Sequence, residues 1–226
     1  MNIGIIGSGI VGQTLGTALA AGGHAVVLGT REPAQLDARK GLAGSLAEWL
    51  ERSGSSASVD TFTAAARHGD AVINATAGTV SLDALRLAGA SALEGRVLLD
   101  VSNPLDFSGG MPPTLTVCNT DSIGERIQRA FPGTRVVKTL NTLTAALMVR
   151  PTVVAGGDHH IFVSGDDADA RRQVARWLHD WFGWPAESVI DLGDITTARG
   201  TEMWLPLWVR LWQALGTPMF NLRLVR

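Results

Sequence analysis

A run of closely spaced glycines near the N-terminus is the first feature of the sequence that could do chemistry. The pattern G-x-G-x-x-G is formed by Gly7, Ser8, Gly9, Ile10, Val11 and Gly12. In such a run the first glycine permits a tight turn, the second lets the backbone approach a pyrophosphate, and the third lets a helix pack closely on a strand. Free N–H groups at the start of that helix bind an anion without any charged side chain. The pattern therefore predicts a phosphate cradle.

The surroundings of the glycines support this interpretation. An apolar strand is expected at 2–6, a helix at 10–22 and a second strand at 24–29, so strand, glycines, helix and strand follow in order within about 30 residues. The alternative is a glycine-rich turn that holds no ligand. The ordered context favours a dinucleotide-binding unit over that alternative.

The end of the second strand indicates which dinucleotide is bound. An NAD site places a carboxylate there, which accepts hydrogen bonds from the ribose hydroxyls. Here the strand ends in Gly29, followed by Thr30 and Arg31. A guanidinium pairs well with a 2′-phosphate, and a threonine hydroxyl adds a donor. These residues favour NADP over NAD.

One residue in this stretch keeps the other interpretation open. Glu32 lies at about the right distance from the glycines to be the ribose acid. It also comes just before Pro33, where an acid would complement the N-terminus of a helix predicted over 33–52. A solvated loop position remains the alternative for Arg31.

The elements that must position these residues alternate between strands and helices. Further strands are expected at 57–60 (weakly signalled), 70–76, 96–102, 135–140, 160–165 and 188–193. Further helices are expected at 61–68, 79–90, 120–131, 167–182 and 196–214, with the longest loop at 102–113. This alternation predicts an α/β fold with a doubly wound, mostly parallel sheet of the Rossmann type. We divide the chain into a dinucleotide-binding domain at 1–194 and a helical C-terminal extension at 195–226, which packs on the acceptor side or forms a dimer interface.

Composition narrows the possible chemistry. The chain has 226 residues, 46% of them hydrophobic, and a net charge of −2, which gives no electrostatic argument for nucleic acid or a membrane surface. It has no tyrosine, which excludes a Tyr-x-x-x-Lys acid/base pair, and a single cysteine, Cys118, which is expected to be buried and reduced. No apolar stretch has the length and continuity of a membrane span, so we expect a cytoplasmic protein without a metal site.

No convincing proton donor for a carbonyl substrate is found. Lys138 and Asn141 are separated as Lys-x-x-Asn at a strand end, where alternation points them to opposite faces. Lys138 is interpreted as a sheet-edge or loop contact, and Asn141 as a polar group near the nicotinamide. The tryptophans spaced four apart, Trp204, Trp208 and Trp212, are interpreted as core or interface residues rather than as a ring-stacking wall.

The ordered motifs resemble the NADPH-dependent coenzyme F420 reductase family. The resemblance rests on the glycine motif, "GTR" at 29–31, "VVKTLNT" at 136–142 and "DLGDITTARGTEMWLPLW" at 191–208. It implies that Gly7 to Gly12 surround the pyrophosphate and that Thr30 and Arg31 hold the 2′-phosphate. It further implies that two groups of residues after later strands bind the cofactor: Ala75, Thr76 and Ala77, and then Ser102, Asn103 and Pro104. Asn141 would lie near the nicotinamide. The archaeal members carry a histidine and a proline in the Asn141 segment, which this chain lacks.

These observations predict an NADP-dependent oxidoreductase that passes a hydride between NADP(H) and a deazaflavin such as F420. A deazaflavin ring accepts the negative charge itself, so the reaction depends mainly on aligning two rings. Two alternatives remain open: an NADPH-dependent reductase of a flavin, ferric chelate or imine, and a non-catalytic NADP-sensing module. The expected partners are a small-molecule hydride acceptor and a second copy of the chain.

Overall fold

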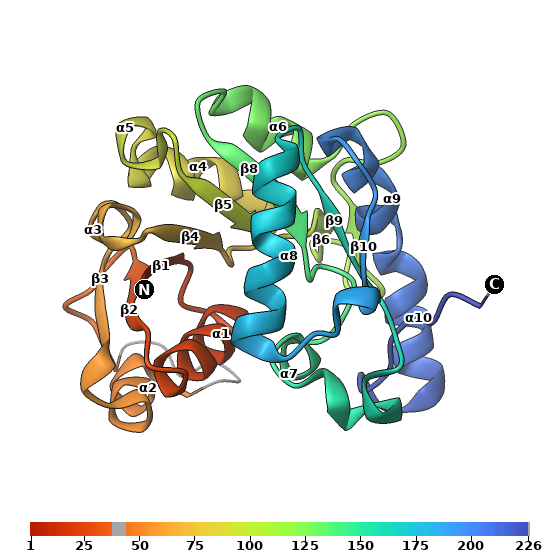
Figure 1. Ribbon diagram of the computed structural model, residues 1–226, viewed down its shortest axis with the longest axis horizontal. Coiled ribbons are helices and arrows are strands. Elements are labelled where there is room, and N and C mark those ends of the chain that lie inside the picture. Colours follow the sequence, from red (N-terminus) through yellow and green to blue (C-terminus); the bar gives the residue numbers. More distant parts are fainter. Residues whose placement is uncertain (38–43, 226) are drawn as a thin grey trace.

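The centre of the molecule is one eight-stranded sheet, seen in a computed structural model that describes residues 1–37 and 44–225 (Figure 1). The strands lie in the order β10-β9-β8-β5-β4-β1-β2-β3. Their bounds are β1 Asn2–Ile6, β2 Ala25–Thr30, β3 Ala57–Thr61, β4 Ala71–Asn74, β5 Val97–Asp100, β8 Arg135–Thr139, β9 Ile161–Ser164 and β10 Val189–Asp191. The weakly signalled strand near 57–60 is thus present as β3.

Parallel pairing brings the predicted site segments to one edge. Strands β8, β5, β4, β1, β2 and β3 all run parallel, whereas β9 runs antiparallel to β8. The strand order reverses between β1 and β4, which is where ligands bind in open sheets of this kind. The predicted doubly wound, mostly parallel sheet is confirmed.

Helices cover both faces of the sheet. One hydrophobic cluster joins the sheet to residues of α1 (Ile10–Ala21), α2 (Leu46–Ser53), α7 (Ala145–Met148) and α8 (Ala168–Phe182). The other joins it to α3 (Phe62–His68), α4 (Gly78–Ala88), α5 (Ala90–Leu93), α6 (Ile123–Ala130) and α9 (Ala198–Met203). Figure 1 shows α8 crossing in front of the strands. Successive residues of one strand belong to different clusters: Leu99 of β5 lies in the first cluster and Leu98 in the second.

The helix predicted over 33–52 is wrong in its first part. Residues 33–37 form turns, and α2 begins only at Leu46. Ser45 and Glu48 form a reciprocal capping box, which satisfies the free N–H groups at that point and fixes the start of the helix. Residues 38–43 lie outside the described part of the chain. Glu32 therefore does not occupy the first turn of a helix.

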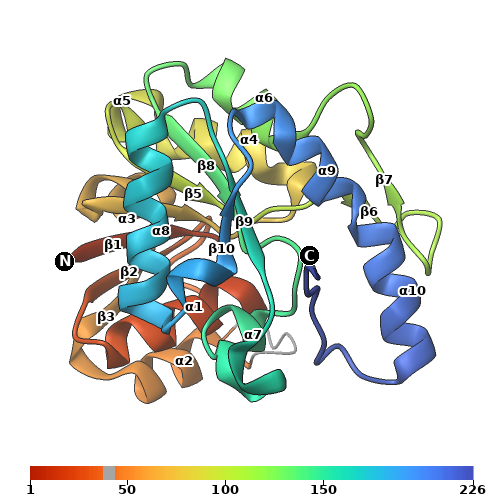
Figure 2. The same ribbon diagram turned by 45° about the vertical axis from the view of Figure 1, so that its right-hand side comes forward.

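The predicted C-terminal helix is divided into two. After a short 3₁₀ turn at Ile195–Thr197, α9 ends at Met203 and α10 spans Leu205–Leu215. Pro206 lies in the first turn of α10, where its missing N–H removes the hydrogen bond that would continue the preceding helix. Figure 2 shows α10 standing away from the sheet, with the chain returning beside β9. His160 N–H donates to Leu222 O there.

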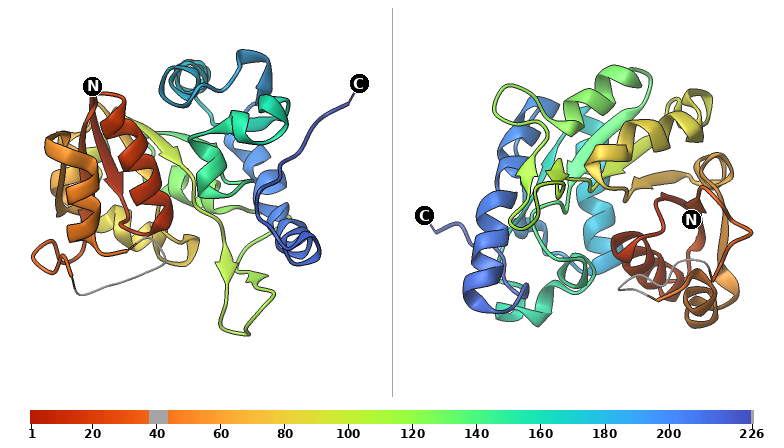
Figure 3. Two further views of the ribbon diagram at one scale, coloured as in Figure 1. Left: turned by 90° about the horizontal axis from the view of Figure 1, so that it is seen from below. Right: turned by 180° about the vertical axis from the view of Figure 1, so that it is seen from behind.

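The long loop predicted at 102–113 contains an antiparallel hairpin of β6 (Leu105–Asp106) and β7 (Thr114–Leu115). In the left view of Figure 3 this hairpin and α10 both project from the same side of the molecule. Cys118 follows the hairpin and is exposed, so the expectation of a buried thiol is wrong. Over residues 1–37 and 44–225, none of the helices combines the length and the apolar character needed to cross a membrane.

Candidate cofactor site

The glycine motif forms the tight turn between β1 and α1. Gly7 has φ of +114°, and a Cβ there would lie 2.8 Å from the carbonyl of Ala75. A Cβ on Gly12 would lie 2.0 Å from the carbonyl oxygen of Gly7. A Cβ on Gly9, in contrast, would meet nothing within 4 Å. Two glycines thus satisfy the packing of the turn, and the third leaves its outer surface open for a ligand.

The start of α1 offers N–H groups without a competing acid. Gly9 caps the helix with no side-chain hydrogen bond, and the first turn, Ile10–Gln13, contains no acidic residue. The positive end of the helix dipole and these N–H groups therefore face the open surface over Gly9. Such an arrangement fits the pyrophosphate of a dinucleotide.

Packing explains why the second strand ends in glycine. A Cβ on Gly29 would lie 3.1 Å from Ala65 Cβ, from Phe62 Cδ1 and from the carbonyl oxygen of Ile5. A side chain at this position, including a ribose-binding acid, would therefore crowd helix α3 and strand β1. The next residue, Thr30, accepts a hydrogen bond from Ser8 Oγ at 3.5 Å and so connects the strand end to the glycine turn.

Arg31 and Glu32 extend beyond the strand into solvent. Both side chains are exposed. Among the described residues, no hydrogen bond or ion pair holds the Arg31 guanidinium. A cation held on the open surface beside the phosphate cradle, without an internal carboxylate, fits a 2′-phosphate. The choice between Arg31 and Glu32 as the discriminating residue stays a prediction.

The end of β4 is held by a side chain that the sequence analysis did not identify. Asn74 is fully buried and donates to Asp100 Oδ1 at 2.9 Å and to Ser81 Oγ at 3.2 Å. Its Oδ1 accepts from the hydroxyl of Thr76 at 2.7 Å. The start of segment 75–77 is therefore held in place at the carboxyl edge of the sheet, and its role on the adenosine side stays a prediction.

The segment after β5 is tied to its neighbours at three consecutive residues. Ser102 Oγ donates to Asp100 Oδ1 at 2.7 Å. Asn103 O accepts from Gly78 N at 3.0 Å, and Pro104 O accepts from Thr116 N at 2.8 Å. We call residues 102–104 the nicotinamide loop, after the role that the sequence predicts for them. Its backbone is preorganised before any ligand binds.

Asn141 lies directly against this loop. Asn141 Nδ2 donates to Asn103 Oδ1 at 2.9 Å, and Asn103 Nδ2 donates to Asn141 O at 2.7 Å. The preceding residue, Leu140, has a left-handed φ of 57°. A bulky residue in that conformation costs about 1–3 kcal/mol and persists only where its surroundings enforce it. The structure thus brings together two amides that were predicted to lie near the nicotinamide.

Lys138 differs from its predicted role. It was expected at a sheet edge or in a loop contact. The loop contact is present, because Lys138 Nζ donates to Ser102 O at 2.7 Å, but the side chain is 1% exposed and also pairs with Asp100 at 2.7 Å and Glu202 at 2.8 Å. Burial alone would lower the pKa of Lys138, but the charges of Asp100 and Glu202 outweigh burial and raise that pKa. The ion pairs were not predicted, because both partners are distant in sequence and belong to β5 and α9.

Glu202 links the C-terminal extension to the site region. Its carboxylate accepts from the N–H groups of Ile123 and Gly124 at the start of α6, at 2.8 and 3.0 Å. An ion pair joins the same two helices as well, because Arg199 Nε donates to Glu125 Oε2 at 2.8 Å. This bond to Arg199 is the main reason that the pKa of Glu125 is lowered. Helix α9 is therefore anchored under the end of β8 by charged groups.

The tryptophans of the last helices pack within the chain to different degrees. Trp204 is partly buried and donates through its indole N–H to Thr142 O at 3.0 Å, next to Asn141. Trp208 stacks on Phe220 of the C-terminal segment, with ring centroids 5.6 Å apart. Trp212 is 40% exposed. Packing accounts for the first two rings, and a role for the third in an interface stays a prediction.

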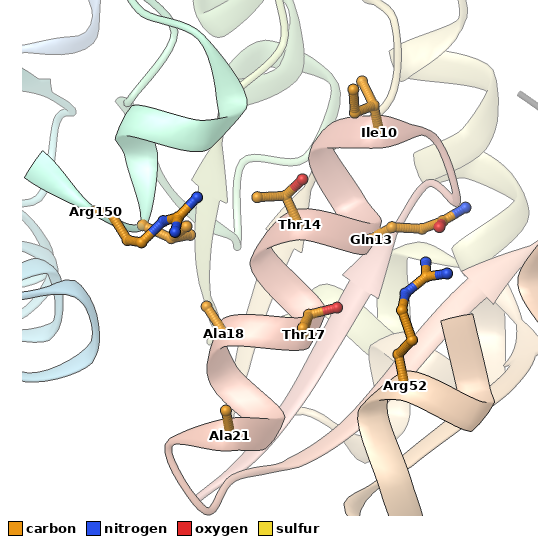
Figure 4. Close-up of a pocket in the computed structure, with 9 residues that line it drawn as sticks. Ile10, Gln13, Thr14, Thr17, Ala18, Ala21, Arg52 and Arg150 are labelled. Carbon is orange, nitrogen blue, oxygen red and sulfur yellow. The ribbon is translucent and has the colours of Figure 1, made fainter. Parts of the chain in front are cut away.

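A groove of about 500 Å³ runs along the outer face of α1. It extends from Ile10, beside the phosphate cradle, to Ala21. Figure 4 shows Arg150 and Arg52 on opposite sides of this helix. Because two guanidinium groups flank the groove, it favours an anionic occupant.

The fold and these strand-end segments define a Rossmann-type protein whose open edge fits a dinucleotide. The sequence of residues 2–104 matches the family described as coenzyme F420-dependent NADP oxidoreductases. A protein from Arthrobacter sp. FB24, described as a candidate F420-dependent NADP-reductase, is 51% identical, with complete coverage of both chains and a TM-score of 0.93. The chain belongs to this family, and it is an NADP-dependent oxidoreductase.

More distant relatives share parts of this arrangement. Metalloreductase STEAP3 of Rattus norvegicus is 28% identical over 213 residues, which are 91% of this chain. The chain spans 37% of the length of that relative. A reductive aminase from Aspergillus terreus, in complex with NADPH and ethyl levulinate, has a TM-score of 0.62 at 18% identity, over 95% of this chain and 62% of its own. This last likeness supports the fold alone.

Proposed function

We propose that the protein transfers a hydride between NADP(H) and a deazaflavin such as coenzyme F420. The observation that carries the proposal is the chemistry of the predicted nicotinamide end. The side chains that meet there are the amides of Asn103 and Asn141. The nearby Lys138 ammonium forms ion pairs with internal carboxylates. A carbonyl reductase needs a positioned proton donor, whereas a deazaflavin ring accepts the hydride with little help from the protein.

The residues present also fit the cofactor. NADP(H) would lie with its pyrophosphate over Gly9, its 2′-phosphate near Thr30 and Arg31, and its nicotinamide near residues 102–104 and Asn141. The remaining predicted contacts are Ser8, Ile10 and Val11 in the glycine turn, and Ala75, Thr76 and Ala77 after β4. When bound, the cofactor supplies the hydride, and the protein orients it. The family membership favours an enzyme over an NADP-sensing module.

The proposal is tested by mixing the purified protein with NADPH and F420 and following the deazaflavin absorption band. Loss of that band at a rate proportional to the enzyme concentration is expected. The reverse reaction, with reduced F420 and NADP⁺, gives the preferred direction. Turnover of NADPH with other acceptors but none with F420 would refute the proposed substrate and leave the oxidoreductase class intact.

A second candidate acceptor is a ferric chelate. It is favoured by the 28% identity to the metalloreductase STEAP3 and by the absence in this chain of the histidine and proline of the archaeal F420 reductases. A screen of F420, free flavins, ferric chelates and cyclic imines under saturating NADPH separates these acceptors.

We also propose that the protein acts as a homodimer. Helix α10 leaves Leu207, Trp212 and Leu215 between 40% and 56% exposed. A single helix that exposes this much apolar surface is typical of an interface. Light scattering at several concentrations tests this, and a monomer at all of them would contradict it.

A further inference from the structure

One buried side chain connects the nicotinamide loop to the C-terminal extension. Lys138 Nζ donates to the carbonyl oxygen of Ser102 at 2.7 Å, in addition to its ion pairs with Asp100 and Glu202. An ammonium has three N–H donors, and here each has a partner. The three partners belong to the loop after β5, to β5 itself and to α9. Because every donor is in use, no N–H of this lysine is left to face a substrate.

The contacts around Ser102 fix the loop from both sides. Asp100 Oδ1 accepts from the backbone N–H of Ser102 at 3.1 Å, while the other oxygen of the same carboxylate pairs with Lys138. The carbonyl of Ser102 is held by Lys138 itself. The peptide unit held by the lysine leads directly into Asn103, whose side chain contacts Asn141.

We propose that Lys138 is a positioning residue for hydride transfer: it holds the nicotinamide loop in register through the Ser102 carbonyl. The proposal rests on the placement of the nicotinamide at this loop in the proposed function. Displacement of a positioning segment by about 1 Å can reduce the rate about 100-fold while leaving binding elsewhere intact. The lysine thus acts through Ser102 and Asn103 and does not touch the cofactor.

The simpler alternative is a lysine that only stabilises the fold. A structural ion pair affects the two halves of the cofactor site alike, whereas a positioning residue affects the nicotinamide half. The two are separated by comparing NADPH with 2′,5′-ADP, which carries the adenosine and the 2′-phosphate but no nicotinamide.

The variants separate the loss of a buried positive charge from the loss of the bond that positions the nicotinamide loop. Lys138→Met alone leaves Asp100 and Glu202 without their cation and is prone to misfold. The double variant Asp100→Asn/Lys138→Met removes one carboxylate together with the lysine and keeps an acceptor oxygen at position 100. Arg199→Met is the matched control, because Arg199 joins α9 to α6 through Glu125 and is not among the partners of the nicotinamide loop.

For the double variant we expect kcat to fall about 10–100-fold, the range that small misplacements produce. The Kd for NADPH is expected to rise, because the nicotinamide half is affected, while the Kd for 2′,5′-ADP stays within about twofold. The preference for NADPH over 2′,5′-ADP therefore falls. In Arg199→Met both quantities should be unchanged. An unchanged kcat in the double variant, a parallel loss of affinity for both ligands, or a failure to fold overturns the proposal, since the last two indicate a structural role.

The outcome is independent of the acceptor. kcat is measured with whichever acceptor the wild type reduces, and the binding comparison needs none. A wild type that does not turn over F420 therefore refutes the proposed substrate but not the role of Lys138. A wild type that binds NADPH no better than 2′,5′-ADP refutes the placement of the nicotinamide and, with it, this proposal.

Discussion

The two ends of the cofactor site are built in opposite ways. At the end of β2, Arg31 and Glu32 extend into solvent, and the neighbouring side-chain contact is a long hydrogen bond between Ser8 and Thr30. At the ends of β5 and β8, Asp100, Lys138 and Glu202 are at most 1% exposed and are bonded to one another and to the loop backbone.

The difference indicates how each end works. An exposed guanidinium without an internal partner recognises a ligand group directly, and it contributes little until that group arrives. A buried ionic network is fully formed without ligand and determines the geometry in which the reactive ring is held. We therefore expect changes at β2 to alter cofactor choice, and changes at β5 and β8 to alter stability and rate.

The largest expected effect is on the buried end. Lys138→Met should reduce the free energy of unfolding by about 3–5 kcal/mol, because it leaves two buried carboxylates without a cation. Urea unfolding measures this loss. The double variant Asp100→Asn/Lys138→Met should recover part of it, since Glu202 still accepts from the N–H groups at the start of α6. Exposed ion pairs contribute up to about 1 kcal/mol. A loss below that value in the single variant would contradict a strong contribution of the buried network to stability.

A smaller effect is expected where the extension meets the site. Trp204→Ala removes a partly buried ring and its hydrogen bond to Thr142, so stability should fall by about 2 kcal/mol with an unchanged KM for NADPH. Thermal unfolding and steady-state kinetics give the two values. The control Trp212→Ala removes a more exposed ring and should cost less. If Trp204→Ala changed the KM for NADPH but not the stability, the tryptophan would belong to the cofactor site.

The smallest expected effect concerns the groove along α1. We expect an anionic acceptor to approach along this groove, so Arg150→Ala should raise the KM for that acceptor about threefold to tenfold and leave the KM for NADPH unchanged, because an exposed charge contributes about 1 kcal/mol. The effect should shrink as salt is added. Arg176→Ala, at an exposed position on α8, serves as the control. An equal change in both variants would mean that the groove does not bind the acceptor.

The sequence predicted the exposed end better than the buried one, for a physical reason. Glycine spacing and the "GTR" stretch are local patterns, so the cradle and Arg31 could be identified without knowing the fold. The network depends on pairs far apart in sequence: Lys138 lies 38 residues from Asp100 and 64 from Glu202. Burial and partners at such separations follow from strand order and helix docking, which no local pattern contains.

Packing also limited the prediction at Gly29. The sequence showed only that an acid is missing there, whereas the structure shows that Ala65 and Phe62 of α3 would crowd any side chain at this position. Likewise, the helix predicted from Pro33 was wrong because the capping box at Ser45 fixes the start of α2. In both cases the deciding contact involves a partner that periodicity does not identify.

The central claim, that an exposed cation at the end of β2 selects NADP, is tested most directly by the Kd values of Arg31→Ala for NADPH and NADH. We predict that the Kd for NADPH rises about 10–100-fold, as expected for lost hydrogen bonds to a charged group. The Kd for NADH should stay unchanged. Glu32→Gln should leave the Kd for NADPH unaltered. An Arg31→Ala protein that keeps its preference for NADPH over NADH would contradict the account.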